Sequence, residues 1–287
     1  MGSHERRRAI GPAVAGTWYP AGAEELRGEV DRYLAGPGET PRGRILGLIE
    51  PHAGYVYSGA VAGRGFALVR GGAYSRVILL GPSHYHGFRG AALPEAEIYR
   101  TPLGEVGLDT VAIDALAGRS GFRRFTEAFS REHSLESEIP FLQRALEPAW
   151  KLIPILIGAR TSGAAAQEIA DALRPWRDDR TLVVASTDFT HFGPRFGYEP
   201  FRDRIEEGLR ELDMGAVREV ESGDPERFEA YVATTGATIC GRDAVDIVMR
   251  LMPGDARAAL VAYDTSGRIT GDWTHSVSYA ALAYSAP

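Results

Sequence analysis

Short apolar segments alternate with longer segments of helical spacing along most of the chain. The apolar segments have the length of strands, and several are apolar throughout, as in a parallel sheet covered on both faces. We predict strands over residues 44–50, 76–80, 152–157, 181–186, 259–263 and 276–284. Apolar residues at every third or fourth position predict helices between them. These helices cover residues 24–34, 53–69, 108–116, 135–146, 164–173, 201–212, 225–231 and 245–251.

Regular alternation of strands and helices predicts the fold class. It favours a single three-layer α/β/α domain with a mainly parallel central sheet. We place this domain at residues 11–287, after a flexible N-terminus of residues 1–10. Residues 89–107 are predicted to form a short hairpin, or a lid beside the functional site discussed below. The polar loop 264–275 is expected to face solvent.

Composition narrows the possible functions. The chain has 287 residues and a formal net charge of -6, which argues against a general nucleic-acid-binding protein. No apolar segment reaches the ~18 residues that span a membrane, and the N-terminus lacks the apolar core of a signal peptide. We therefore expect no membrane partner and a cytoplasmic location. Cys240 is the only cysteine, so an intrachain disulfide and a CxxC metal site are both excluded.

Histidines follow three of the predicted strands at the point where each strand ends. They are His52 after the first strand, His84 and His86 after the second, and His191, together with Asp188, after the fourth. Ligands of open α/β sheets bind at the carboxyl ends of the strands. Histidine is the commonest metal ligand and the usual acid or base at neutral pH. The spacing therefore predicts a shared functional site, with two imidazoles available as half of a metal site.

Four further residues have both a functional and a structural interpretation. His133 lies at the start of the predicted helix 135–146, where it would either point at the sheet edge or serve as a surface residue. Trp18 and Tyr19 would either pin an N-terminal arm or form a pocket wall. Cys240, on a glycine-flanked turn before a helix, is either a stabilised thiolate or a small core residue. Nucleotide-binding motifs of the GxGxxG and GxxxxGK types are absent.

Eight short blocks, in order along the chain, resemble the signature blocks of the Memo family. They are GTWYP, EPHAGYVYSG, LLGPSHYHGF, REHSLESEIPFL, IPILIG, STDFTHFG, ATICGR and HSVSYAA. The resemblance runs from about residue 11 to the C-terminus. It implies a fold similar to that of the class III extradiol dioxygenases of the LigB type, which use non-haem iron. It also implies a possible functional link to radical-SAM and AMMECR1-like proteins.

The resemblance assigns roles to individual residues. It implies that His52, His84 and Cys240 bind a metal, and that His191 is an acid or base oriented by Asp188. A pocket for a small-molecule or peptide ligand is expected to involve Trp18, Tyr55, Tyr57, His86 and His133. The dioxygenases use two histidines and a carboxylate, whereas a thiolate here shifts the preference toward copper or zinc. Iron or copper is the expected metal, with zinc as a third option. Glu138 occupies a position that other members fill with Gln or His.

These assignments imply a metal-dependent oxidoreductase that acts on a small molecule or on oxygen. One alternative is a metal-free enzyme in which Cys240 is the nucleophile and His191 or His84 its base. A second alternative is a binding module for a peptide or a phosphorylated ligand, for which Arg64 and Arg89 would supply positive charge.

Overall fold

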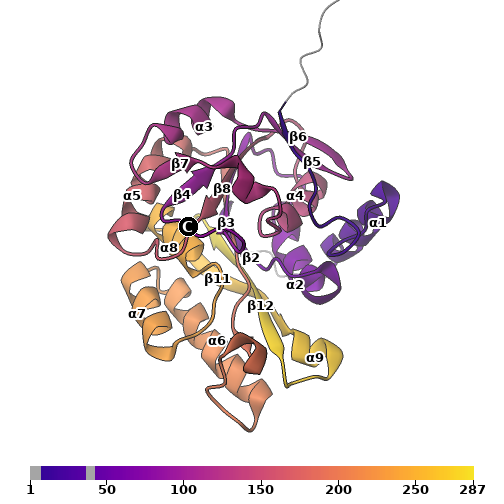
Figure 1. Cartoon of the computed structure of the whole chain (residues 1–287), viewed down its shortest axis with the longest axis vertical. Coiled ribbons are helices and arrows are strands. Elements are labelled where there is room, and N and C mark those ends of the chain that lie inside the picture. Colours follow the sequence, from indigo (N-terminus) through magenta and orange to yellow (C-terminus); the bar gives the residue numbers. More distant parts are fainter. Residues whose placement is uncertain (1–7, 37–42) are drawn as a thin grey trace, which may run out of the picture.

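Four parallel strands side by side form the centre of the fold in the computed structural model, which describes residues 8–36 and 43–287 (Figure 1). In spatial order they are β2 (Ile45–Glu50), β9 (Thr181–Ser186), β3 (Arg76–Pro82) and β8 (Lys151–Ile157). Every residue of β2 and β9 is buried, as expected for strands covered on both faces. The parallel registers of β2 with β9 and of β3 with both β9 and β8 confirm the mainly parallel sheet.

Shorter or antiparallel strands extend the sheet on both sides. Beyond β2 lie β12 (Ser276–Ser285), antiparallel to it, and then β11 (Arg257–Thr265) and β10 (His191–Phe192), which both pair with β12. Beyond β8 lie β4 (Ala91–Leu93), antiparallel to it, and β7 (Phe122–Arg124), parallel to β4. The two C-terminal strands were predicted from sequence, and both are longer than predicted.

Helices cover both faces of the sheet and complete the predicted three layers (Figure 1). One face carries α1 (Ala23–Leu34), α2 (Tyr55–Ala67) and α4 (Ile139–Ala145). The other carries α5 (Ala164–Leu173), α6 (Ile205–Glu221), α7 (Pro225–Thr235) and α8 (Arg242–Leu251). The remaining helices are α3 (Thr110–Ala117), α9 (Ser266–Thr270) and the 3-10 turns Thr126–Phe129, Glu136–Glu138, Arg174–Trp176 and Pro194–Phe196. No helix among the described residues is long and apolar enough to span a membrane.

Small residues let α2 pack tightly against its neighbours. A Cβ atom at Gly63 would lie 2.6 Å from the backbone of Tyr33 in α1, so any side chain there would push the two helices apart. Gly65, on the same helix, leaves room for the buried carboxyl group of Glu50 at the end of β2. These glycines therefore serve helix packing, which is consistent with the absence of a nucleotide motif around Arg64.

Several sequence predictions need correction at their boundaries. Ala9–Ile10 forms strand β1, which pairs with β5 (Ile98–Thr101). The N-terminal segment that was predicted to be flexible, residues 1–10, therefore should not have included these two residues. Residues 1–7 lie outside the described residues. The predicted hairpin is β5 with β6 (Gly104–Gly107), but β4 belongs to the main sheet. Helix α6 begins four residues later than predicted and runs on to Glu221. Loop 264–275 contains α9 and lines a pocket instead of only facing solvent.

Candidate metal centre

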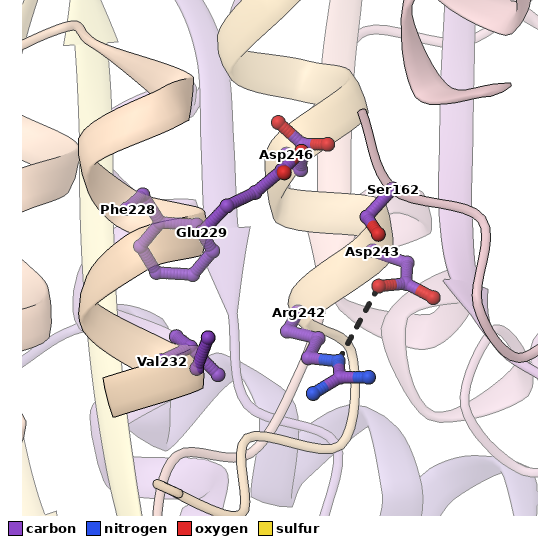
Figure 2. Close-up of a pocket in the computed structure, with 8 residues that line it drawn as sticks. Ser162, Phe228, Glu229, Val232, Arg242, Asp243 and Asp246 are labelled. Carbon is purple, nitrogen blue, oxygen red and sulfur yellow. Dashed lines mark ion pairs between the residues drawn. The ribbon is translucent and has the colours of Figure 1, made fainter. Parts of the chain in front are cut away.

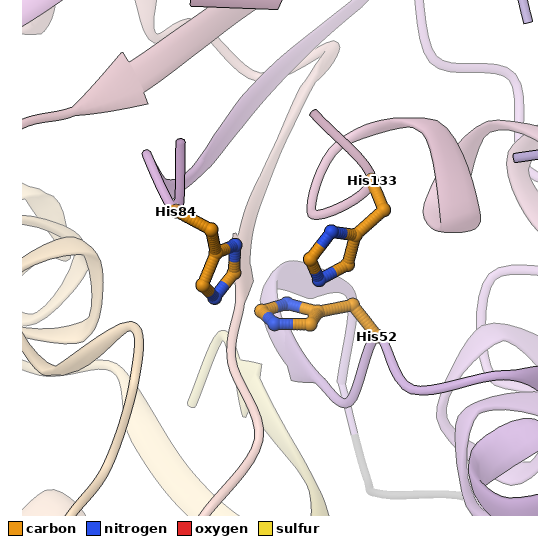
Figure 3. Close-up of side chains that lie close together, drawn as sticks. All are labelled: His52, His84 and His133. Atoms are coloured by element: carbon orange, nitrogen blue, oxygen red, sulfur yellow. The ribbon is translucent and has the colours of Figure 1, made fainter. Parts of the chain in front are cut away.

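The carboxyl ends of β2, β9 and β3 lie next to one another because the three strands are parallel neighbours. The loops that follow them therefore meet at one edge of the sheet. There the ring centroids of His52 and His84 lie 5.3 Å apart (Figure 3). The positions of His52 and His84 after two strands predicted that their side chains would lie close together, as they do here.

A third imidazole joins this pair. The ring of His133, from the loop before the turn Glu136–Glu138, stacks on His84 at 4.4 Å and lies 5.4 Å from His52 (Figure 3). One nitrogen atom from each ring lies within 4.8 Å of the other two, close enough for the three residues to hold a metal ion together. Sequence reasoning placed His133 in the substrate pocket, whereas the structure places it in the histidine cluster.

Glu132 orients His84. Its buried carboxylate accepts a hydrogen bond from the backbone N–H of His84 at 2.6 Å and contacts Nδ1 of the same residue at 2.9 Å. Burial acts to raise the pKa of Glu132, but the hydrogen bonds from His84 outweigh it and hold the pKa below its ordinary value. A carboxylate partner makes Nδ1 the donor, so Nε2 of His84 keeps its lone pair for a metal.

Ser186 orients His52 in a similar way. The Ser186 hydroxyl lies 2.5 Å from the carbonyl oxygen of Ser134, which can only accept, so the single hydroxyl proton points there. Nδ1 of His52, 2.7 Å from the same hydroxyl, must then be the donor. The Nε2 lone pair of His52 is left free for the cluster.

The contacts of the Ser186 hydroxyl also indicate whether the Glu138 carboxyl group carries a proton. Oε1 of Glu138 lies 2.7 Å from Ser186 Oγ, whose proton is already committed to Ser134. Burial raises the pKa of Glu138 well above its ordinary value, so the carboxyl group is protonated and donates to Ser186. A protonated glutamate thus supplies the donor that a Gln amide would supply at this position.

Two of the three imidazoles are held in the neutral state that binds metals. Burial, reinforced by His84 and His133, holds the pKa of His52 well below its ordinary value. Burial, again with His84, lowers the pKa of His133 to about 4. Neutral imidazole is the metal-binding form, and Nδ1 of His133 has no hydrogen-bond partner. The donor set therefore fits a transition metal.

Cys240 lies beside this cluster, next to His52. Its Sγ is 3.3 Å from His52 Nε2 and accepts a hydrogen bond from the backbone N–H of Asp188 at 3.2 Å. Among the described residues, the donors that are mutually close are the three imidazoles, and the thiol is their neighbour. Burial, followed by the nearby Asp188 carboxylate, raises the pKa of the Cys240 thiol. Without a metal the sulfur is therefore protonated.

His191 lies beside the cluster. Its Nδ1 lies 3.0 Å from the carbonyl oxygens of both Phe189 and Thr238, so Nδ1 is the donor, and Nε2 is not engaged by these carbonyls. The carboxylate of Asp188 instead accepts from the backbone N–H of His52 at 2.9 Å. The expectation that Asp188 orients His191 is thus corrected, because backbone carbonyls do so and the Asp188 carboxylate supports the His52 loop.

A pocket of about 520 Å³ adjoins this edge and is lined by Asp188 and His191. Its volume suits a small organic ligand. Trp18 and Tyr57 form part of the wall, and the Trp18 ring lies 4.0 Å from that of His133, so one wall residue of the pocket contacts the cluster. The other lining residues are Thr17, Ala53, Gly54, Val56, Arg195, Phe196, Ser266, Thr270, Asp272, His275, Val277 and Tyr279.

Two residues assigned to this pocket from sequence lie elsewhere. Tyr55 is 2% exposed, its hydroxyl donates to the carbonyl of Ser137 at 2.7 Å, and it belongs to the core. Successive helical residues point about 100° apart, so Tyr55 and Tyr57 cannot both face the pocket. His86 packs edge-on against Phe125, with ring centroids 5.3 Å apart, and does not line the pocket.

Sequence reasoning missed the other side of the pocket. His275 and Asp272 come from the loop that was expected to face solvent, and Arg195 comes from the turn after β10. Arg195 therefore supplies the positive charge at this pocket, where Arg64 and Arg89 had been considered. No local pattern marks these residues, since they approach the site only through the pairing of β10 with β12.

Fold and site together define a class: three-layer α/β/α proteins with a histidine-rich candidate metal centre at the carboxyl edge of a parallel sheet. Within this class the chain belongs to the Memo family, whose profile, described as Memo-like protein, matches residues 10–283. It is 33% identical to a MEMO1 family protein of Methanopyrus kandleri, over 95% of this chain and 98% of that protein. It is 31% identical to Protein MEMO1 of Danio rerio, over 94% and 95% of the two chains.

A solved structure shares the fold. The crystal structure of an uncharacterized protein from Escherichia coli K12 superposes with a TM-score of 0.54, covering 84% of this chain and 99% of that one. The two sequences are 14% identical, so the likeness concerns the fold alone.

A separate hollow of about 180 Å³ lies between α7 and α8 (Figure 2). Glu229 of α7 points toward Asp246 of α8, while Asp243 forms an ion pair with Arg242. Arg250 contacts the carboxyl groups of Glu229 and Asp246 at 3.0 and 2.9 Å. This network ties the two helices together.

We expect this network to make the protein less stable as the pH rises. Burial, together with the neighbouring carboxylate of Glu229, raises the pKa of Asp246 to about 8. Between about pH 4 and pH 8 the folded protein keeps a proton that the unfolded chain has lost, so stability falls with pH by up to about 1.4 kcal/mol per unit. Asp246→Asn removes this titration, so wild type should lose stability relative to the variant from pH 5 to pH 8.

Urea unfolding of both proteins at several pH values measures the difference. Asp179→Asn, at a fully exposed side chain, serves as the control and should follow wild type. A constant stability difference between wild type and Asp246→Asn across this pH range would show that Asp246 has an ordinary pKa.

Proposed function

We propose that the protein is a metal-dependent oxidoreductase that acts on a small molecule in the 520 Å³ pocket. The observation that carries this proposal is the set of three imidazoles from three separate segments, each with a nitrogen within 4.8 Å of the others. Here His52 and His133 are kept neutral by burial, which suits metal binding.

The residues divide into a binding group and a proton-transfer group. His52, His84 and His133 would hold the metal, and Cys240 would add a sulfur ligand next to His52. Iron or copper fits this set, and zinc fits it as well. A bound iron or copper would supply redox chemistry at the end of the pocket. His191 would exchange protons with the ligand through Nε2, because its Nδ1 proton is held by two carbonyl groups.

The metal-free alternative is disfavoured by the protonation states. A nucleophilic cysteine needs a thiolate, but burial and Asp188 raise the pKa of Cys240. Its nearest base, His52, has a pKa held low by burial and by the other histidines, so it is a poor acceptor for the thiol proton.

One observation favours the binding module as a second candidate. Val56 and Tyr57, at the wall of the pocket, are 69% and 40% exposed, and such exposed apolar side chains often contact a partner. Peptide binding that survives loss of both His52 and His84 would support this candidate. The functional link to radical-SAM and AMMECR1-like proteins stays a prediction from the family resemblance.

Proton release on metal binding tests whether Cys240 is a ligand. At pH 8 ordinary imidazoles are neutral and release nothing, whereas a thiol that becomes a thiolate releases one proton per metal. We expect wild type to release about one proton and Cys240→Ser about none, measured by calorimetry in buffers of different ionisation enthalpy. Equal release by the two proteins would restrict the site to the three imidazoles.

A further inference from the structure

Cys240 and His84 also line a second, smaller hollow of about 120 Å³. Its remaining walls come from the ends of β3 and β8 and from the first turn of α8. It shares no lining residue with the 520 Å³ pocket. Asp188 lines the larger pocket, and its backbone N–H contacts Cys240 Sγ at 3.2 Å, so the small hollow is separated from the larger pocket by directly contacting residues.

The polar groups of the small hollow are largely satisfied. Asp243 accepts a hydrogen bond from the backbone N–H of Thr161 at 2.9 Å and pairs with Arg242 at 3.4 Å. The Ser83 hydroxyl donates to the carbonyl of His86 at 2.9 Å. What remains is a largely apolar wall that Cys240 and His84 also line, which favours an uncharged occupant.

The size of the hollow limits the occupant. Since a water molecule takes up about 30 Å³ of liquid, the space holds only a few non-hydrogen atoms. Its rim is open to solvent, because Ala159 and His84 are both exposed. The larger pocket, in contrast, has room for an organic molecule.

We propose that the small hollow is a separate entrance to the metal centre for uncharged molecules of a few atoms, such as dioxygen or hydrogen peroxide. An organic ligand in the larger pocket would then leave this route open. The use of the entrance rests on the proposed function, but the access of small molecules to Cys240 through it does not require a metal.

Labelling of Cys240 in metal-free protein tests the route, because this is the only thiol in the chain. The reagent is methyl methanethiosulfonate, which is small and uncharged, and mass spectrometry follows the product. Ala159→Phe narrows the rim of the small hollow at an exposed position, and Ala159→Ser is its matched control. Val56→Trp obstructs the larger pocket at an exposed position.

We expect Ala159→Phe to slow labelling by about tenfold or more, because only transient opening would then admit the reagent. Ala159→Ser and Val56→Trp should label at the wild-type rate, and unchanged melting temperatures confirm that all variants fold. Because the raised pKa of the thiol slows labelling in all variants alike, the rates are compared at one pH at which the wild-type thiol reacts. Equal rates in wild type and Ala159→Phe, or labelling that is slowed by Val56→Trp but not by Ala159→Phe, would overturn the proposal. Metal content is measured separately, so loss of the metal site and loss of the entrance give different results.

Discussion

His52→Ala protein should retain little of the metal that wild type binds. His52 lies at the centre of the cluster, close to His84, His133 and Cys240, so its removal breaks contacts to every other donor. At metal concentrations of about 100 times the dissociation constant, binding stabilises the folded protein by about 2.7 kcal/mol. This metal-dependent rise in melting temperature should disappear in the variant. Metal analysis of protein purified without a chelator or a His-tag column gives the stoichiometry directly.

His86→Ala is the matched control, since His86 is an imidazole in the same loop as His84 but packs against Phe125. It should keep both the metal and the metal-dependent stabilisation. If His52 is only a core residue, His52→Ala will lower the melting temperature equally with and without metal. That result, with unchanged metal content, would remove the proposed metal centre.

His191→Ala should keep its metal and lose activity. The His191 side chain is held by the carbonyls of Phe189 and Thr238 and lines the large pocket, outside the three mutually close imidazoles. Loss of a general acid or base typically lowers the rate by about 100- to 10,000-fold. The measurement combines metal analysis with turnover of the first substrate that screening identifies.

His275→Ala is the comparison here, because His275 lines the same pocket from a different loop. It should affect substrate binding more than the rate at saturation, since no role in proton transfer is assigned to it. Metal loss in His191→Ala equal to that in His52→Ala would make His191 a ligand and leave the site without its proposed base.

Local patterns in the sequence were sufficient to predict the α/β/α architecture and the approach of His52 to His84. The strands 152–157 and 181–186 were recognisable because strands buried on both faces must be apolar throughout. His52 and His84 could be paired from their positions in the sequence, since parallel strands carry their carboxyl ends to a common edge. Each of these inferences depends only on residues adjacent in sequence and on a general rule of sheet geometry.

The structure alone decided which other side chains reach the site. His133 follows no strand, and it enters the cluster because Glu132 bonds both to its backbone and to His84. Tyr55 and Tyr57 look equivalent in sequence, but the orientation of α2 buries one and leaves the other in the pocket.

The protonation states also depended on tertiary contacts. The sequence shows that the chain contains histidines, a single thiol and Glu138, but their pKa values are set by burial and by neighbours far away in sequence. The Ser186 hydroxyl, which fixes the donor on His52 and the proton on Glu138, is an ordinary strand residue in the sequence. The sequence by itself thus determined the fold class and the strand ends that meet, whereas long-range packing determined the third imidazole, the pocket and the charge of each group, because those properties arise from contacts that no local pattern encodes.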